Sequence, residues 1–115
     1  MAEDGEYYLI QIPNLDNEPY SIIPIVLNNK TYYFEYKWNI REEKAYLSIY
    51  LLINNSKLYL IKNRGLVLFY DLTKHIQDRD NWSGELYLKP INISNYYNYN
   101  QNNISTDYEL SYVPQ

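Results

Sequence analysis

The longest alternation of hydrophobic and polar positions runs from Thr31 to Ile53, with the sequence TYYFEYKWNIREEKAYLSIYLLI. In its first half aromatic side chains recur at every second position, with mainly polar residues between them. In its second half an aliphatic series beginning at Ala45 keeps the same period. This period is typical of strands with one buried face. Because the polar run from Asn39 to Lys44 has the length of a hairpin loop, the pattern predicts one long β-hairpin.

The same alternation predicts which side chains form the core. Thr31, Glu35 and Lys37 fall between the aromatic positions and are expected on the opposite face of the sheet. The core is expected to be built on Tyr32, Phe34, Tyr36, Trp38, Leu47, Ile49 and Leu51.

Further strands are predicted on both sides of the hairpin. Residues 6–12 and 19–27 precede it, and Pro24 marks the second as an edge strand or a bulge because proline cannot donate a ladder hydrogen bond. Asn28-Asn29 and Asn54-Asn55 predict tight turns, since asparagine tolerates the left-handed backbone region. Later strands are predicted at residues 57–62, 66–70, 84–89 and 108–112, with a turn at residues 63–65.

Three later segments complete the predicted fold. The apolar run at residues 66–70 is continuous, which predicts burial on both faces. Residues 71–81 are expected to form a loop or at most one short helical turn. Residues 91–106, rich in tyrosine and asparagine, have no sustained period and predict a long loop. The chain is therefore predicted to be all-β, a small antiparallel barrel or sandwich of about seven to eight strands.

Length and charge narrow the class of protein. A chain of 115 residues is expected to form one β domain, residues 1–115, with an acidic leader at residues 1–5. Cysteine is absent, which excludes disulfides and thiolate metal sites. The net charge is −4 and no basic block occurs, so no nucleic-acid partner is expected. No secretory signal and no apolar run near ~20 residues is present, which predicts a soluble protein made in the cytoplasm, without a membrane partner.

No set of residues in the chain predicts catalysis. His75 is the single histidine, and no serine lies in a nucleophile-elbow context, so we expect neither enzymatic activity nor a cofactor. Asp78, Asp80, Asn81 and Glu85 have carboxylates and amides at short spacing, as a calcium loop does. The glycine is misplaced and flanking helices are missing, so a charged turn is favoured over a metal site.

The sixteen tyrosines suggest surfaces for binding, although the composition of an AT-rich genome would also produce them. Trp82, which no periodic pattern constrains, is expected to be exposed and could form a sugar-stacking platform with nearby tyrosines. The segment Tyr96–Asn103 combines the residue types common in binding loops, and the alternative is an unstructured surface loop. The candidate interface residues are Tyr96, Tyr97, Asn98, Tyr99, Asn100, Trp82, Ile40 and Arg41.

The order of motifs adds a resemblance. Trp38-Asn39 stands at the hairpin turn, a hydrophobic segment follows at residues 57–70, a glycine leads the strand at 84–88, and DYELSYVP closes the chain at 107–114. From about Tyr8 to Pro114 this order resembles that of the small baseplate plug proteins of contractile-tailed phages. The tyrosine- and asparagine-rich loop and the acidic leader depart from the resemblance.

The resemblance implies a structural role and no catalytic motif. It implies a place in the virion tail baseplate near the central hub, in a phage or a phage-tail-like particle. The partners would be hub, tube or spike proteins, and the contact would be repeated symmetrically. A carbohydrate-binding or receptor-recognition β-sandwich module is the alternative function, and an adaptor domain in another bacterial assembly is a third.

Overall fold

The structure is a computed structural model that describes residues 7–92 and 99–114. No helix occurs in these residues, and the chain is all-β, as predicted. Its seven strands are β1 (Tyr8–Gln11), β2 (Tyr20–Leu27), β3 (Lys30–Asn39), β4 (Lys44–Ile53), β5 (Ser56–Gly65), β6 (Glu85–Pro90) and β7 (Tyr108–Val113).

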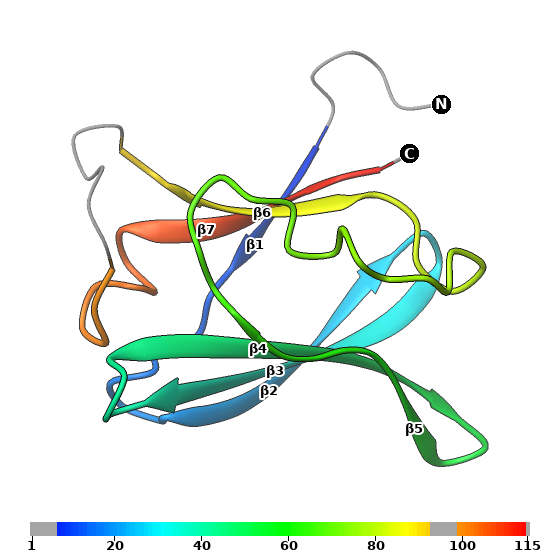
Figure 1. The fold of residues 1–115 in the computed structure, drawn as a ribbon, viewed down its shortest axis with the longest axis horizontal. Coiled ribbons are helices and arrows are strands. Elements are labelled where there is room, and N and C mark those ends of the chain that lie inside the picture. The colour runs from blue at the N-terminus through cyan, green and yellow to red at the C-terminus, as the bar shows by residue number, and fades with distance from the viewer. Residues whose placement is uncertain (1–6, 93–98, 115) are drawn as a thin grey trace.

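The strands form two antiparallel sheets that face each other (Figure 1). The larger sheet has the order β2-β3-β4-β5 and the smaller sheet has the order β1-β7-β6. On one side the segment after β5 joins the sheets, because Leu66 N–H donates to Ala45 O and Phe69 N–H donates to Leu88 O. The sheets do not close into a barrel, so the predicted sandwich is the arrangement that forms.

The central hairpin is present with the predicted register. Phe34 pairs with Ile49 and Tyr36 with Leu47 across β3 and β4. The turns on either side have left-handed backbones at both asparagine pairs, with φ of 54° and 63° at residues 28 and 29 and of 51° and 64° at residues 54 and 55. These are the angles that a two-residue hairpin turn requires, which explains the asparagines. Pro24 lies in β2, an edge strand, as predicted.

The core lies between the two sheets. Each predicted core residue is buried except Trp38, which is partly buried and packs against the same cluster. The smaller sheet contributes Leu86 and Leu88 from β6 and Tyr108, Leu110 and Tyr112 from β7. Burial of each large side chain contributes roughly 1.5–3 kcal/mol to folding, so this shared cluster is the main source of stability.

Two predictions about the segment after the hairpin are wrong. β5 continues through the predicted turn at residues 63–65, because Asn63 takes up a bulge with a φ of 54° and its N–H donates to Ser48 Oγ at 2.8 Å. Residues 66–70 do not form a strand buried on both faces. Leu66 is buried, whereas Phe69 and Tyr70 are exposed, because this apolar run crosses from the larger sheet to the smaller one.

Candidate interaction surface

The tyrosine- and asparagine-rich loop is described only at its end. Tyr96, Tyr97 and Asn98 lie outside the described residues. Asn100 is exposed, and its side-chain oxygen accepts hydrogen bonds from the N–H groups of Asn102 and Asn103, each at 2.9 Å. The described end of the loop is therefore a structured turn, and a contact between Asn100 and a partner stays a prediction.

Tyr99 faces inward rather than toward a partner. Its hydroxyl donates to Leu66 O at 2.7 Å and accepts from Ala45 N–H at 3.2 Å. Its ring meets Trp38 and Tyr108 edge-on, at centroid distances of 6.0 and 6.1 Å. The side chain of Tyr99 therefore connects the loop to the core, and its role as an interface residue stays a prediction.

The predicted exposure of Trp82 is also wrong, since only 1% of its surface is accessible. The indole packs edge-on against Tyr32 and Tyr112, with ring centroids 5.1 and 5.4 Å away. Gly84 makes this packing possible, because a Cβ at that position would lie 2.7 Å from the Tyr112 ring. A sugar-stacking platform on Trp82 is therefore unavailable, and the nearby glycine was the sequence signal for a close approach.

The turn between β3 and β4 projects as predicted. Ile40 is 75% exposed and Arg41 is exposed beside it. Asn39 stabilises this turn through its side-chain oxygen, which accepts from Glu42 N–H at 2.9 Å. Ile40 and Arg41 stay predicted interface residues.

The most organised surface lies on the outer face of the larger sheet, and no local pattern in the sequence predicts it. Glu35 lies on this face, as predicted, yet it is only 6% exposed because tyrosines from the neighbouring strands cover it. Tyr20 of β2 donates its hydroxyl to one carboxylate oxygen at 2.5 Å, and Tyr59 of β5 donates to the other at 3.1 Å. Both oxygens of Glu35 thus orient aromatic rings on strands that flank β3 and β4.

Aromatic stacking continues across this face. Tyr33 and Tyr50 are paired in register and stack with ring centroids 5.1 Å apart and planes inclined by 12°. Tyr50 also lies 5.3 Å from Tyr59, its partner on β5. Such cross-strand aromatic pairs stabilise a sheet and hold the rings in fixed positions.

Lysines cover the same rings. Lys37 Nζ lies 5.9 Å from the Tyr20 ring centroid, Lys57 Nζ lies 4.8 Å from Tyr50, and Lys62 Nζ lies 4.9 Å from Tyr59. The three lysines are exposed, and a cation above an aromatic face is attracted by the ring quadrupole. We call this surface the tyrosine–lysine face; it consists of Tyr20, Tyr33, Glu35, Lys37, Tyr50, Lys57, Tyr59 and Lys62.

The charge of Glu35 is stabilised where it lies. Burial alone would raise the pKa of Glu35, but hydrogen bonds from Tyr20 and Tyr59 and the charges of Lys37 and Lys57 outweigh it and lower the pKa. The hydrogen bond to this carboxylate also raises the pKa of Tyr20 to about 12. The face therefore carries an ionised carboxylate that tyrosines and lysines surround.

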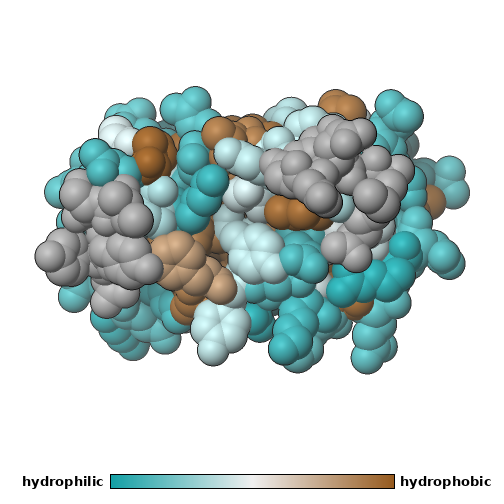
Figure 2. Space-filling view, turned by 90° about the horizontal axis from the view of Figure 1, so that it is seen from above, coloured by the Kyte–Doolittle hydropathy of each residue, from teal (hydrophilic) through white to brown (hydrophobic). Residues whose placement is uncertain are grey.

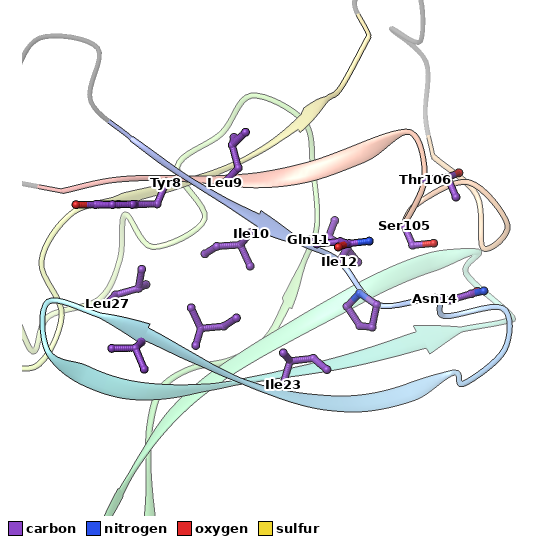
Figure 3. A pocket seen from close by; sticks show the side chains of 13 residues that line it. Tyr8, Leu9, Ile10, Gln11, Ile12, Asn14, Ile23, Leu27, Ser105 and Thr106 are labelled. Carbon is purple, nitrogen blue, oxygen red and sulfur yellow. The ribbon is translucent and has the colours of Figure 1, made fainter.

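A second candidate surface is the groove between β1 and β2, the facing outer strands of the two sheets (Figure 3). Ile10 points from β1 toward β2, and Ile23 and Leu27 point from β2 toward β1, whereas Leu9 points away. The groove has a volume of about 780 Å³ and no charged side chain lines it. It could accept an apolar segment, but the tyrosine–lysine face has the greater number of fixed polar and aromatic groups.

The face on the side of the smaller sheet differs from both surfaces. Figure 2 views the molecule from that side, and hydrophilic residues cover most of what is visible. Hydrophobic residues appear there as small separate groups. Scattered groups of this kind are ordinary on protein surfaces.

Comparison with known families decides the class of protein. Residues 7–115 match a family model described as cyanophage baseplate Pam3 plug gp18. The chain belongs to this baseplate plug family. The resemblance seen in the order of motifs is thereby confirmed, and the plug has a structural role in the phage tail baseplate, among other baseplate proteins. A search of curated proteins finds no match.

The residues weighed for chemistry in the plug lie on its surface. His75 is exposed within the turns at residues 71–81. Asp78 accepts hydrogen bonds from both the N–H and the side-chain amide of Asn81, as a charged turn does. Across residues 7–92 and 99–114, no group of three or more histidine or acidic side chains could hold a metal ion. The same residues contain no helix able to cross a membrane.

Proposed function

We propose that this baseplate plug is a non-catalytic component of a contractile tail, placed near the central hub and held there by protein–protein contacts. Membership of the plug family across residues 7–115 is the observation that carries the proposal. Residues 1–115 would act as one domain, made in the cytoplasm of the host bacterium and repeated symmetrically around the tail axis. We propose that the plug contacts neither nucleic acid nor a membrane.

The tyrosine–lysine face and the β3–β4 turn are the proposed contact surfaces. Tyrosine is enriched in protein interfaces because its ring adds large contact area with few rotatable bonds. Tyr20 is 49% exposed on this face, and Ile40 extends from the turn at the end of the same sheet. We also include Asn100, Tyr96, Tyr97 and Asn98 among the proposed interface residues.

The alternative of a carbohydrate-binding or receptor-recognition module has less support. Sugar stacking requires an aromatic ring with a free face, and Trp82 is buried. Tyr50 is 5% exposed and Lys57 covers its ring. Neither Trp82 nor Tyr50 therefore offers a free ring face to a sugar.

Chemical cross-linking of purified tails tests the proposed place of the plug. A lysine-reactive cross-linker followed by mass spectrometry is expected to join the plug to hub, tube or spike proteins, at a constant amount of plug per tail. The proposal would be contradicted by absence of the plug from purified tails, or by cross-links only to peripheral baseplate proteins.

A further inference from the structure

Charge is unevenly distributed between the two sheets. The strands of the larger sheet contain a single acidic residue, Glu35, and six basic residues: Lys30, Lys37, Lys44, Lys57, Lys62 and Arg64. The whole chain has a net charge of −4, so the rest of the molecule is strongly acidic. Three of the six, Lys37, Lys57 and Lys62, lie over tyrosine rings on the outer face of this sheet, which favours a partner of negative charge there.

The three lysines of the tyrosine–lysine face are held before any partner arrives. Each ammonium lies over a tyrosine ring, and two of the rings are oriented by the Glu35 carboxylate. Side chains that are ordered in advance lose less entropy on binding. The buried carboxylate accepts hydrogen bonds from Tyr20 and Tyr59, while the lysine ammonium groups lie over the tyrosine rings.

Exposed apolar side chains surround these charges on the same face. Ile22, Val26 and Leu52 alternate outward on β2 and β4, with exposed fractions of 37%, 67% and 46%. Apolar and aromatic area with a few fixed charges is typical of protein interfaces. A nucleic acid would require free ring faces for base stacking, and here the rings contact one another or lysine.

We propose that the tyrosine–lysine face docks on an acidic surface of a neighbouring baseplate protein, with carboxylates of that protein pairing with Lys37, Lys57 and Lys62. This inference rests on the proposed function and specifies the chemistry of the partner. The lysines supply charge complementarity, and the tyrosines and apolar residues supply the buried area.

Charge reversal with a matched control tests this contact. A phage lacking the gene is complemented with wild-type plug, with Lys57→Glu/Lys62→Glu, or with Lys74→Glu/Lys89→Glu. The control pair changes the net charge equally, and Lys89 Nζ also lies over a tyrosine ring, 4.6 Å from Tyr7 outside the larger sheet. Plug per tail is measured by quantitative mass spectrometry against the tube protein. We expect at least a tenfold loss for the first pair and an unchanged amount for the control.

Additional experiments distinguish loss of the contact from loss of the fold. Circular dichroism and urea unfolding verify the fold, and the milder Lys57→Gln/Lys62→Gln pair is expected to give an intermediate loss if the glutamate pair does not fold. Suppressor phages that regain infectivity with Lys57→Glu/Lys62→Glu are expected to replace an acidic residue by lysine in another baseplate protein. Normal incorporation of the reversed pair overturns the inference and leaves the proposed function intact, whereas absence of wild-type plug from tails overturns both.

Two other possible partners of the tyrosine–lysine face, a second copy of the plug and nucleic acid, would give different results. Self-association of wild-type plug in analytical ultracentrifugation, abolished by Lys57→Glu/Lys62→Glu, would show that the face binds a second copy. Binding of a fluorescent single-stranded DNA oligonucleotide at physiological salt, abolished by the same pair, would show that it binds nucleic acid. Either result overturns docking on an acidic baseplate protein.

Discussion

The core tyrosines differ in whether their buried hydroxyl groups have a hydrogen-bonding partner. Tyr32 donates its hydroxyl to Asn81 O at 2.6 Å, and Tyr112 donates to Ser83 O. The hydroxyl of Tyr36 is buried and meets no hydrogen-bonding partner among the described residues, and burial raises its pKa. An unpaired buried hydroxyl costs about 1–3 kcal/mol, so Tyr36 stabilises the core through its ring alone.

Removing the hydroxyl of Tyr36 is therefore not expected to destabilise the fold. Tyr36→Phe should raise the free energy of unfolding by about 1 kcal/mol, whereas Tyr32→Phe should lower it by about 1 kcal/mol through the lost hydrogen bond. Urea denaturation of both variants measures the difference. A larger loss for Tyr36→Phe than for Tyr32→Phe would show that the Tyr36 hydroxyl has a favourable partner.

The carboxylate of Glu35 predicts a pH dependence of stability. Its pKa is lowered below the ordinary 4.5, with burial opposing the shift and Tyr20, Tyr59, Lys37 and Lys57 favouring the ionised form. A lowered pKa in the folded state means that the stabilisation is complete above the ordinary pKa and is lost as pH falls through the folded-state value.

Glu35→Gln tests this dependence directly. The variant is expected to be less stable than wild type at pH 7, and the difference in free energy of unfolding is expected to shrink as the pH is lowered below 4.5. Urea unfolding of both proteins between pH 7 and pH 3 measures it. A difference that stays constant over this range would mean that the Glu35 charge contributes nothing to the fold.

At the scale of elements, the join between the loop and the core depends on Tyr99. Its hydroxyl bonds to Leu66 O and to Ala45 N–H, and burial raises its pKa to about 12. Tyr99→Phe is expected to lower the free energy of unfolding by about 1–3 kcal/mol. Tyr70→Phe, at a tyrosine that is 63% exposed, serves as the control and should change it little. Equal unfolding free energies for the two variants would contradict the role given to Tyr99.

This role also changes how the loop can be tested. A deletion of residues 96–103 removes Tyr99 together with any interface residues, so it would destabilise the core as well as the contact. Substitutions at single exposed positions such as Asn100 separate the two effects. The loop is thus partly a structural element and only partly a candidate surface.

The elements that the sequence predicts well are those that a local pattern determines. The period of two across β3 and β4 and the asparagine pairs at both turns are local signals, and they predict the hairpin and its register. The bulge at Asn63 depends on Ser48, and the crossing run at residues 66–70 depends on β6. Such contacts join residues distant in sequence, so local propensity did not reveal them.

The interaction surface was missed for a related reason. Tyr20, Tyr33, Tyr50 and Tyr59 belong to four different strands and gather only once those strands pair. Tyr33 and Tyr50 alternate outward on their strands, but no local pattern indicates the burial of Glu35 beneath their neighbours. No periodic pattern constrains Trp82, and its burial is determined by packing on Tyr32 and Tyr112, which are distant in sequence.

At the scale of the whole molecule, the plug has surfaces of different character. The larger sheet presents lysines over tyrosine rings, and the open side of the sandwich is an uncharged apolar groove. The order of motifs along the chain was enough to suggest the baseplate plug family, which the family comparison then established. The order of motifs does not identify the contact surface, because contact depends on how the strands pair.

Cryo-electron microscopy of the intact tail tests the account most directly. The reconstruction is expected to contain the seven-stranded sandwich beside the central hub, with the tyrosine–lysine face covered by an acidic surface of a neighbouring protein. Density for the plug at the periphery of the baseplate, or a tyrosine–lysine face open to solvent in every copy, would contradict it.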